Sequence, residues 1–210
     1  MNRGVEKLSE GKLQGQVLSD FKSFFDEESL GGLGERARSA KDGVLSEGRH
    51  RVVVLDFEKN GKRLKVAVKA FGRQGFLKDR YDFKKGSKAE RSFKAANFLK
   101  SRGVGTPQPI AYFDCWEGSR LVESFYLSDY LESLTSFKSA LIQAYEERAD
   151  CRFLVAKLDH IASSIRRMHD VGFWHRDLGN QNMEFQVSGD GEWGEVQFID
   201  LNRGRIREGL

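Results

Sequence analysis

The chain has 210 residues, of which 39% are hydrophobic and 31% charged, and its formal net charge is +4. This balance suits a soluble globular protein made of one domain or two small lobes. No apolar run approaches the roughly 20 residues of a membrane helix, and the polar start is unlike a signal peptide. Cys115 and Cys151 lack metal-type spacing, so we expect reduced core cysteines in a cytoplasmic protein.

Basic residues recur along the chain, and three of them alternate near its end at Arg203, Arg205 and Arg207. One interpretation is ordinary solvated surface. The functional alternative is attraction to anionic partners such as a nucleotide, an acidic sugar or anionic lipid heads. Charge alone also allows nucleic acid, but the chain has no nucleic-acid-binding motif, so we expect no such partner.

The first segment of the chain differs in character from the rest. Phe21, Phe24 and Phe25 indicate a short amphipathic helix, and Gly31–Gly34 indicates a flexible break. We therefore expect residues 1–45 to form an N-terminal extension that docks on the lobe that follows. Contact of this segment with a membrane surface is the alternative.

A strand–turn–strand pattern comes next. Residues 51–57 and 64–71 have the composition of strands, and Lys59–Lys62 has that of a turn. Val66–Lys69 matches the V-A-I-K pattern, in which the lysine contacts the α- and β-phosphates of a nucleotide. Lysines are common on exposed strands. From this motif alone, an ordinary surface role for Lys69 is therefore as well supported as a nucleotide-binding role.

Residues 87–99 then have the sequence of a helix. Ser87 suits the N-cap and Glu90 follows three residues later, which is a capping-box pattern. The functional alternative is that Glu90 pairs with Lys69 and fixes the lysine over the phosphates. One carboxylate cannot serve both roles fully, and we favour the pairing because Glu90 lies one strand-to-helix connection after Lys69.

The helix ends at Gly103–Pro109, which contains both prolines of the chain and indicates a rigid crossover. Strands are expected over residues 110–113 and 120–127. In kinases, which carry the V-A-I-K pattern, the residues that follow such a strand form the hinge between two lobes. We therefore expect backbone groups of Asp129 and Leu131 to bind adenine.

The most specific motif of the chain is His175–Asn182, which reads H-R-D-L-x-x-x-N. It follows Cys151–Asp170, where apolar residues recur at helical spacing, and Gly172 is a natural helix stop. Asp177 can accept a proton from a hydroxyl group, and Asn182 can hold a metal ion on the same loop. This pairing is typical of the catalytic loop of kinase-type phosphoryl transfer, and a merely polar turn would not explain five specified positions.

A second acidic site follows the catalytic loop. Residues 183–187 and 192–199 are expected to form two strands, and the second ends at Asp200. Asp200 falls where kinases carry Asp-Phe-Gly, whose aspartate holds Mg²⁺. Asn202 replaces the glycine and still tolerates a left-handed backbone. Asn182 and Asp200 are therefore the predicted metal ligands.

The order of these motifs resembles the lipopolysaccharide core kinases of the Kdo/WaaP type and their InaA-like relatives, over roughly residues 45–208. Gly103–Pro109 reads G-x-G-T-P-x-P and Ile199–Arg205 reads I-D-x-N-R-G-R, which separates the chain from eukaryotic-type protein kinases. The resemblance implies an α+β, protein-kinase-like two-lobed fold. Its small antiparallel-sheet N-lobe would span residues 46–128, and a shortened, mostly helical C-lobe would span residues 129–210.

The resemblance also implies an activity. The chain would be a bacterial ATP-dependent kinase that transfers the γ-phosphate to a sugar hydroxyl, on Kdo or heptose, of the lipopolysaccharide inner core. It would act on the cytoplasmic side of the inner membrane, with peripheral contact to anionic lipid. Lys69, held by Glu90, would neutralise phosphate charge, Asn182 and Asp200 would bind Mg²⁺, and Asp177 would take the proton of the acceptor hydroxyl. The sugar and the hydroxyl are left open.

Two features depart from the kinase pattern. The chain has no G-x-G-x-x-G phosphate loop, and Gly43–Arg49 is the nearest candidate, whose backbone amides can contact phosphate. Leu210 follows Asp200 by ten residues, so the activation segment and A-P-E motif of a protein kinase do not follow in this sequence. A nucleotide-binding pseudokinase is therefore the main alternative function, and a bacterial protein kinase is the lesser one.

Overall fold

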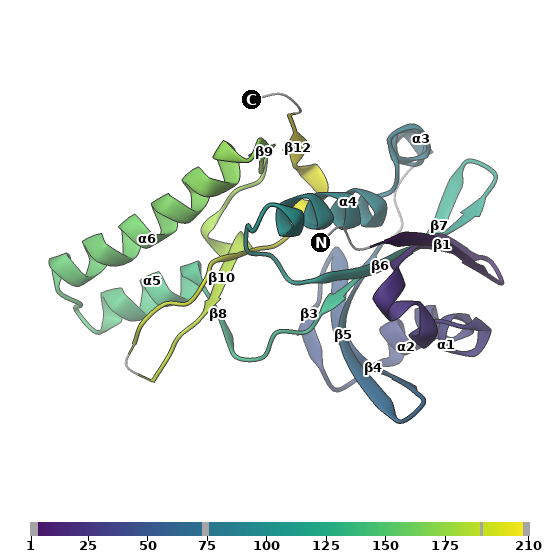
Figure 1. Cartoon of the computed structure of the whole chain (residues 1–210), viewed down its shortest axis with the longest axis horizontal. Coiled ribbons are helices and arrows are strands. Elements are labelled where there is room, and N and C mark those ends of the chain that lie inside the picture. Colours follow the sequence, from purple (N-terminus) through teal and green to yellow (C-terminus); the bar gives the residue numbers. More distant parts are fainter. Residues whose placement is uncertain (1–3, 73–75, 190, 208–210) are drawn as a thin grey trace. The chain divides into compact units, whose positions relative to one another are not determined.

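A computed structural model of the chain describes residues 4–72, 76–189 and 191–207 (Figure 1). The chain forms two compact units. Unit 1 comprises Met1–Lys94 with Gln108–Tyr130, and unit 2 comprises Ala95–Pro107 with Leu131–Leu210. Each unit therefore takes its residues from two separate stretches of the sequence, and each is described below by itself.

Unit 1 is built on a seven-stranded antiparallel sheet with the strand order β1-β2-β6-β7-β5-β4-β3. The β4–β5 hairpin turns at Asn60 and Gly61, which both have positive φ and so suit a two-residue turn. Val66 and Val68 on β5 are fully buried, because alternate residues of a strand face the same side. The strands are β1 (Val5–Glu10), β2 (Leu13–Leu18), β3 (Val44–Ser46), β4 (His50–Lys59), β5 (Lys62–Phe71), β6 (Pro109–Glu117) and β7 (Arg120–Asp129).

The first 45 residues, for which the sequence pattern predicts a docked extension, supply part of this sheet. β2 pairs with β6 and β1 pairs with β2, so the segment covers an edge that β6 would otherwise expose. The predicted amphipathic helix is instead the 3₁₀ helix η1 (Ser19–Phe24), followed by α1 (Glu27–Gly31) and α2 (Leu33–Ser39). Phe25 enters the core, with its ring centroid 5.1 Å from that of Phe57 and 5.6 Å from that of Phe113.

Two helices lie between β5 and β6, namely α3 (Phe76–Lys85) and α4 (Lys88–Ser101). α4 occupies nearly the predicted range of residues 87–99. Its start is fixed by Ser87, whose Oγ accepts the backbone N–H of Glu90 at 2.9 Å. Its end is followed by Gly103, which has a φ of 68° and so provides a left-handed cap. Ala89 and Phe93 pack this helix against a small core with Tyr112.

Unit 2 contains a three-stranded antiparallel sheet, a two-stranded pair and two long helices. The sheet has the order β11-β10-β8, and β12 pairs with β9. The strand predicted over residues 192–199 is reduced to a two-residue strand, whose Phe198 N–H donates to the Gly105 carbonyl at 2.9 Å. The elements are β8 (Leu134–Ser136), α5 (Phe137–Glu146), α6 (Cys151–Asp170), β9 (Phe173–Trp174), η2 (Asn180–Asn182), β10 (Met183–Gln186), β11 (Gln197–Phe198), η3 (Leu201–Arg203) and β12 (Arg205–Ile206).

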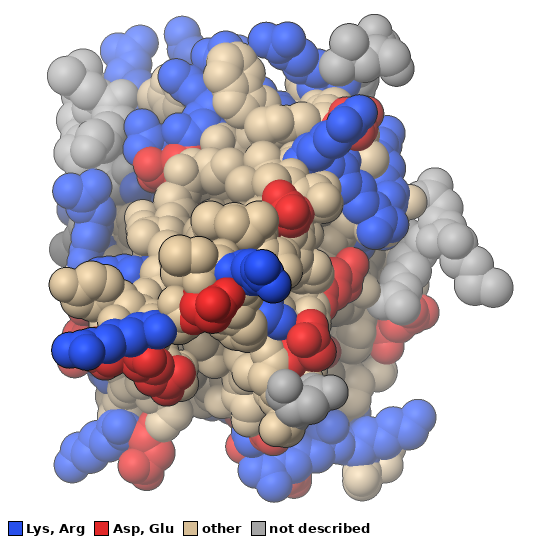
Figure 2. All heavy atoms as spheres, turned by 90° about the vertical axis from the view of Figure 1, so that its left-hand side faces the viewer, with Lys and Arg blue, Asp and Glu red and all other residues tan. Residues whose placement is uncertain are grey.

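The helix α6 has the predicted bounds, but its apolar stripe is only partly core. Ile161 and Met168 are buried, whereas Leu158 is 48% exposed. Cys151, at the start of the helix, is exposed, so the prediction of two core cysteines is correct only for Cys115. Figure 2 views the end of unit 2 that carries the α5–α6 connection, where uncharged atoms cover much of the face. Within the part of the chain that the structure describes, no helix has both the length and the apolar character to cross a membrane.

Candidate functional site

His175, the first residue of the catalytic-loop motif, is buried and braces the loop. Its Nδ1 accepts the backbone N–H of Asp177 at 3.2 Å, and its Nε2 lies 2.9 Å from the carbonyl oxygen of Ile199. A neutral imidazole with its proton on Nε2 satisfies both bonds. His175 therefore ties the loop that carries Asp177 to the strand end that precedes Asp200.

Asn182 completes this hydrogen-bonded frame. Its side-chain Nδ2 donates to the backbone carbonyl of Asp177 at 2.8 Å. The backbone carbonyl of Asn182 accepts the backbone N–H of Ile199 at 3.1 Å. The side chain is buried, with 7% exposure. Because Nδ2 is engaged as a donor, Oδ1 is the atom with which Asn182 would bind a cation. The predicted metal ligand is thus held in one orientation by the predicted base.

Asp200 is held in a left-handed backbone conformation, with φ 58° and ψ 46°. Asn202, a residue type that tolerates this backbone, lies instead within the 3₁₀ helix η3. Aspartate visits the left-handed region more readily than most residues, and such strained positions cluster at functional sites. Asn202 instead holds the Asp200 carboxylate, because its Nδ2 donates to Oδ1 at 2.5 Å.

Arg203 is a site residue that the sequence pattern places only within a basic cluster. Its Nη1 lies 3.1 Å from Oδ2 of Asp177, and both side chains are well exposed. Its position could have identified it as a site residue, because it lies three residues after Asp200 in the same I-D-x-N-R-G-R stretch. The contact joins the two predicted catalytic segments through their side chains, and it puts a fixed positive charge beside the predicted base.

The oxygen atoms of Asn182 and Asp200 suit Mg²⁺, because this hard cation prefers carboxylate, amide and phosphate oxygens. Over residues 4–72, 76–189 and 191–207, no three His, Cys, Asp or Glu side chains group into a metal site. A magnesium ion at these two residues would therefore take its other ligands from nucleotide phosphates and water. The donor set fits the predicted metal.

Lys69 lies on β5 in unit 1, between Val52 of β4 and Tyr126 of β7 in the strand register. Its side chain is half-buried, and Nζ lies 5.5 Å from the centroid of the Phe71 ring. The lysine is thus positioned by an interior strand of the sheet, with ladder partners on both sides. This fixes its backbone more firmly than a sheet edge would.

The Ser87 half of the predicted capping box is present at Glu90. The Glu90 backbone N–H is bound by Ser87, and its Oε1 accepts Lys94 Nζ at 2.5 Å. The predicted pairing of Glu90 with Lys69 stays a prediction. Glu90 also lies near Asp114, a carboxyl with only 4% exposure. Burial raises the pKa of Asp114 to about 6, and repulsion from the Glu90 carboxylate adds to this effect.

The predicted hinge begins at the end of β7. The backbone N–H of Asp129 donates to the carbonyl of Gln108 at 2.8 Å, and that of Tyr130 donates to the carbonyl of Lys65 at 3.3 Å. Because its amide is engaged, Asp129 would contact adenine through its carbonyl. Leu131 belongs to unit 2, and the adenine-binding role of both residues stays a prediction.

The candidate phosphate loop forms the connection between β3 and β4. Gly43 precedes β3 with a φ of 70°, and its carbonyl accepts the backbone N–H of Val54 at 2.8 Å. Residues 47–49 link the two strands, and the Arg51 side chain contacts the Glu47 carboxylate and the Ala40 carbonyl. The segment therefore forms a hairpin without the G-x-G-x-x-G sequence.

Comparison with known proteins identifies the chain's relatives. The model of the lipopolysaccharide kinase (Kdo/WaaP) family matches residues 47–209. No curated protein sequence matches significantly. A solved structure of WaaP in complex with acyl carrier protein shares 22% identity and a TM-score of 0.56, over 83% of this chain and 66% of that chain. At this identity the likeness shows the kinase-like fold, and this chain spans just under two thirds of that structure's length. Because the family model matches most of the chain, the protein belongs to the Kdo/WaaP family of lipopolysaccharide kinases.

Proposed function

We propose that the protein is an ATP-dependent phosphotransferase that phosphorylates a sugar hydroxyl of the lipopolysaccharide inner core. The observation that carries the proposal is the hydrogen-bonded frame of unit 2. Asp177, Asn182 and the residue before Asp200 are joined by direct bonds, in a chain that belongs to the lipopolysaccharide kinases. A pseudokinase would not require a base and both metal ligands to be held on one frame.

Asp177 would act as the base. Its carboxylate is exposed, so an acceptor hydroxyl can reach it, and its backbone is fixed on both sides by His175 and Asn182. Arg203 holds one carboxylate oxygen, which leaves the other to orient the hydroxyl and take its proton. The positive charge of Arg203 would also stabilise negative charge that develops on the transferred phosphoryl group.

The remaining roles concern the nucleotide. Asn182 Oδ1 and the Asp200 carboxylate would hold Mg²⁺, which supplies charge neutralisation on the β- and γ-phosphates when bound. Lys69 would add a second positive charge at the phosphates, with Glu90 as its orienting partner. Most of the rate enhancement would come from positioning and electrostatics, because phosphoryl transfer of this kind needs no covalent intermediate.

The test is phosphate incorporation from labelled ATP into inner-core lipopolysaccharide in the presence of Mg²⁺. We expect Asp177→Asn, which keeps the size of the side chain, to lower kcat by about a hundredfold to ten-thousandfold. Asp159→Asn is the matched control, because Asp159 is an exposed acid of unit 2 on α6. Equal incorporation by wild type and Asp177→Asn would refute the assignment of the base. Nucleotide binding without incorporation into any acceptor would favour the pseudokinase.

A further inference from the structure

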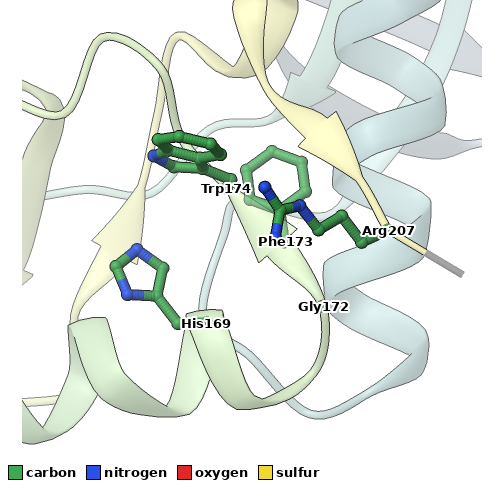
Figure 3. A pocket seen from close by; sticks show the side chains of 5 residues that line it. All are labelled: His169, Gly172, Phe173, Trp174 and Arg207. Atoms are coloured by element: carbon green, nitrogen blue, oxygen red, sulfur yellow. The ribbon is translucent and has the colours of Figure 1, made fainter. Parts of the chain in front are cut away.

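Unit 2 has a small pocket at the end of α6, and Asp177, Asn182 and Asp200 are not among the residues that line it. Its volume is about 230 Å³, and it is lined by His169, Gly172, Phe173, Trp174 and Arg207. Figure 3 shows His169 and Trp174 bordering the same space, with the Arg207 guanidinium reaching into it from the segment after β12. The Trp174 side chain is 49% exposed, so the indole is open to a ligand.

The pocket is held by backbone pairing. In the β9–β12 pair, Arg205 lies opposite Trp174 and Ile206 lies opposite Phe173. The backbone N–H of Arg207 donates to the Gly172 carbonyl at 2.8 Å, which extends the pairing by one step. Gly172 has a φ of 86°, and a Cβ there would lie 2.6 Å from the Arg207 carbonyl oxygen. The close approach that places Arg207 therefore requires glycine at position 172.

The chemistry of the lining suits a sugar that carries a negative charge. The Arg207 guanidinium lies 5.2 Å from the centroid of the Trp174 ring. A guanidinium that rests on an aromatic ring still presents its N–H fork to a carboxylate or phosphate. The exposed face of an indole offers a flat apolar surface for the C–H groups of a sugar ring, and the imidazole of His169 adds a hydrogen-bonding group.

The charges around the pocket agree with an anionic ligand. Arg205 and Arg207 lie two residues apart, which puts their side chains on the same side of the extended segment. The acids nearest in sequence to the lining are Asp170, whose carboxylate lies 3.5 Å from Arg166, and Glu208, which lies outside the described residues. The volume lies below the roughly 300–1,000 Å³ of pockets for drug-sized ligands, so the space suits a single sugar ring.

The pocket shares two backbone segments with the proposed base. Trp174 precedes Asp177 by three residues, so their Cα atoms lie at most about 11 Å apart. The segment that carries Arg207 also carries Arg203, which binds the Asp177 carboxylate. An acceptor of two or more sugars can therefore place a hydroxyl at Asp177 and the neighbouring ring at the pocket.

We propose that this pocket is an acceptor subsite, in which Trp174 stacks on a sugar ring and Arg207 binds the carboxylate or phosphate that the ring carries. The inference rests on the proposed kinase function and deepens it. It assigns to residues outside the catalytic frame the recognition of an anionic sugar that is linked to the sugar being phosphorylated. Arg207 would act on acceptor binding and leave the binding of ATP unchanged.

The direct test is binding of small probes to the full chain, followed by NMR of the indole N–H groups of Trp116, Trp174 and Trp193. Glucuronate and glucose 6-phosphate should shift the Trp174 signal, whereas neutral glucose and inorganic phosphate should bind more weakly. Arg207→Gln should weaken the anionic probes about tenfold or more, because a charge-assisted bond is lost. Arg152→Gln, an exposed arginine at the other end of α6, is the control and should bind the probes as wild type does.

Three results would overturn the subsite. The first is that glucose and glucuronate bind with equal affinity. The second is that inorganic phosphate and glucose 6-phosphate bind with equal affinity. The third is that Arg207→Gln binds the anionic probes with unchanged affinity. Trp174→Leu is a second variant that tests the stacking, and it should weaken the carboxylated and phosphorylated sugars alike.

Kinetics separate this inference from the proposed function. In an active wild type, Arg207→Gln should raise the acceptor KM about tenfold and leave the KM for ATP unchanged. An active wild type with an unchanged acceptor KM in Arg207→Gln would refute only the subsite. A wild type that transfers no phosphate, but binds anionic sugars in an Arg207-dependent way, would refute only the kinase function.

Discussion

The motif residues of unit 2 contact one another within one short loop, and in unit 1 the contacts of Glu90 and Lys69 include neighbours on their own helix and strand. His175, Asp177 and Asn182 are linked by hydrogen bonds inside one eight-residue motif. In unit 1, the Glu90 carboxylate binds Lys94 on the same helix, and Lys69 lies against Phe71 on its own strand. The proposed catalytic loop is thus a local structure, while the proposed phosphate-binding residues Lys69 and Glu90 come from a strand and a helix that are separate in the sequence.

After Asp177→Asn, the largest effect is expected from removing the charge of Asp200, the proposed metal ligand next to the unit 2 frame. Asp200→Asn keeps the size of the side chain but removes its negative charge. We expect kcat to fall by about a hundredfold to a thousandfold, as when other electrostatic contributors are lost. The measurement is steady-state phosphate transfer at saturating Mg²⁺ and ATP. Asp159→Asn, an exposed acid on α6, is the control, and an Asp200→Asn enzyme that matches it would exclude Asp200 from the site.

The next effect concerns the buried acid beside Glu90 in unit 1. The pKa of Asp114 is about 6 in the folded chain and 3.8 ordinarily, so between these pH values the folded state binds more protons than the unfolded state. The free energy of unfolding contributed by this group therefore falls as the pH rises through that window. Asp114→Asn removes this slope and should raise stability at pH 7 by up to about 3 kcal/mol.

Urea unfolding between pH 4 and 7 measures this effect, and exposed Asp42→Asn in the same unit is the matched control. If the Asp114→Asn and Asp42→Asn proteins show the same change of stability with pH, the raised pKa of Asp114 is not a feature of the folded protein.

A smaller effect sharpens the role of Asn202. This residue holds one oxygen of the Asp200 carboxylate, so Asn202→Ala should loosen the ligand without removing it. Loss of such a supporting group typically costs about tenfold to a hundredfold in metal affinity. We expect the Mg²⁺ concentration for half-maximal activity to rise by this factor, with kcat largely restored at high Mg²⁺. An unchanged Mg²⁺ dependence would contradict the proposed role.

The smallest effect decides between the two roles of Glu90. Lys94→Ala removes only a partly exposed i,i+4 ion pair and should cost less than about 0.5 kcal/mol of stability, with no change in the KM for ATP. Glu90→Gln should raise the KM for ATP about tenfold if the carboxylate orients Lys69 in the working enzyme. If both variants bind ATP as wild type does, the contacts of Glu90 within its own helix are its only role.

Predictions from the sequence succeeded where the signal was local. The α6 helix, the β4–β5 hairpin and the order of the kinase motifs follow from periodicity, turn residues and spacing, and the family and the kinase-like fold are confirmed. The prediction missed β1 and β2. β2 pairs with β6, about 95 residues later, but β1 pairs with β2 in a local hairpin whose Gly11 turn was a signal that the prediction overlooked.

The sequence by itself determined the candidate chemistry of this protein. Few other kinds of loop carry a candidate base, an amide ligand and an acid at these short, fixed spacings. Only the tertiary structure decided that Arg203 meets Asp177, that Asp200 and not Asn202 takes the left-handed conformation, and that the Arg207 guanidinium lies over the Trp174 ring. These features arise from the pairing of β9 with β12 and from the packing around the catalytic loop. Both join segments about 30 residues apart, beyond the reach of any local pattern.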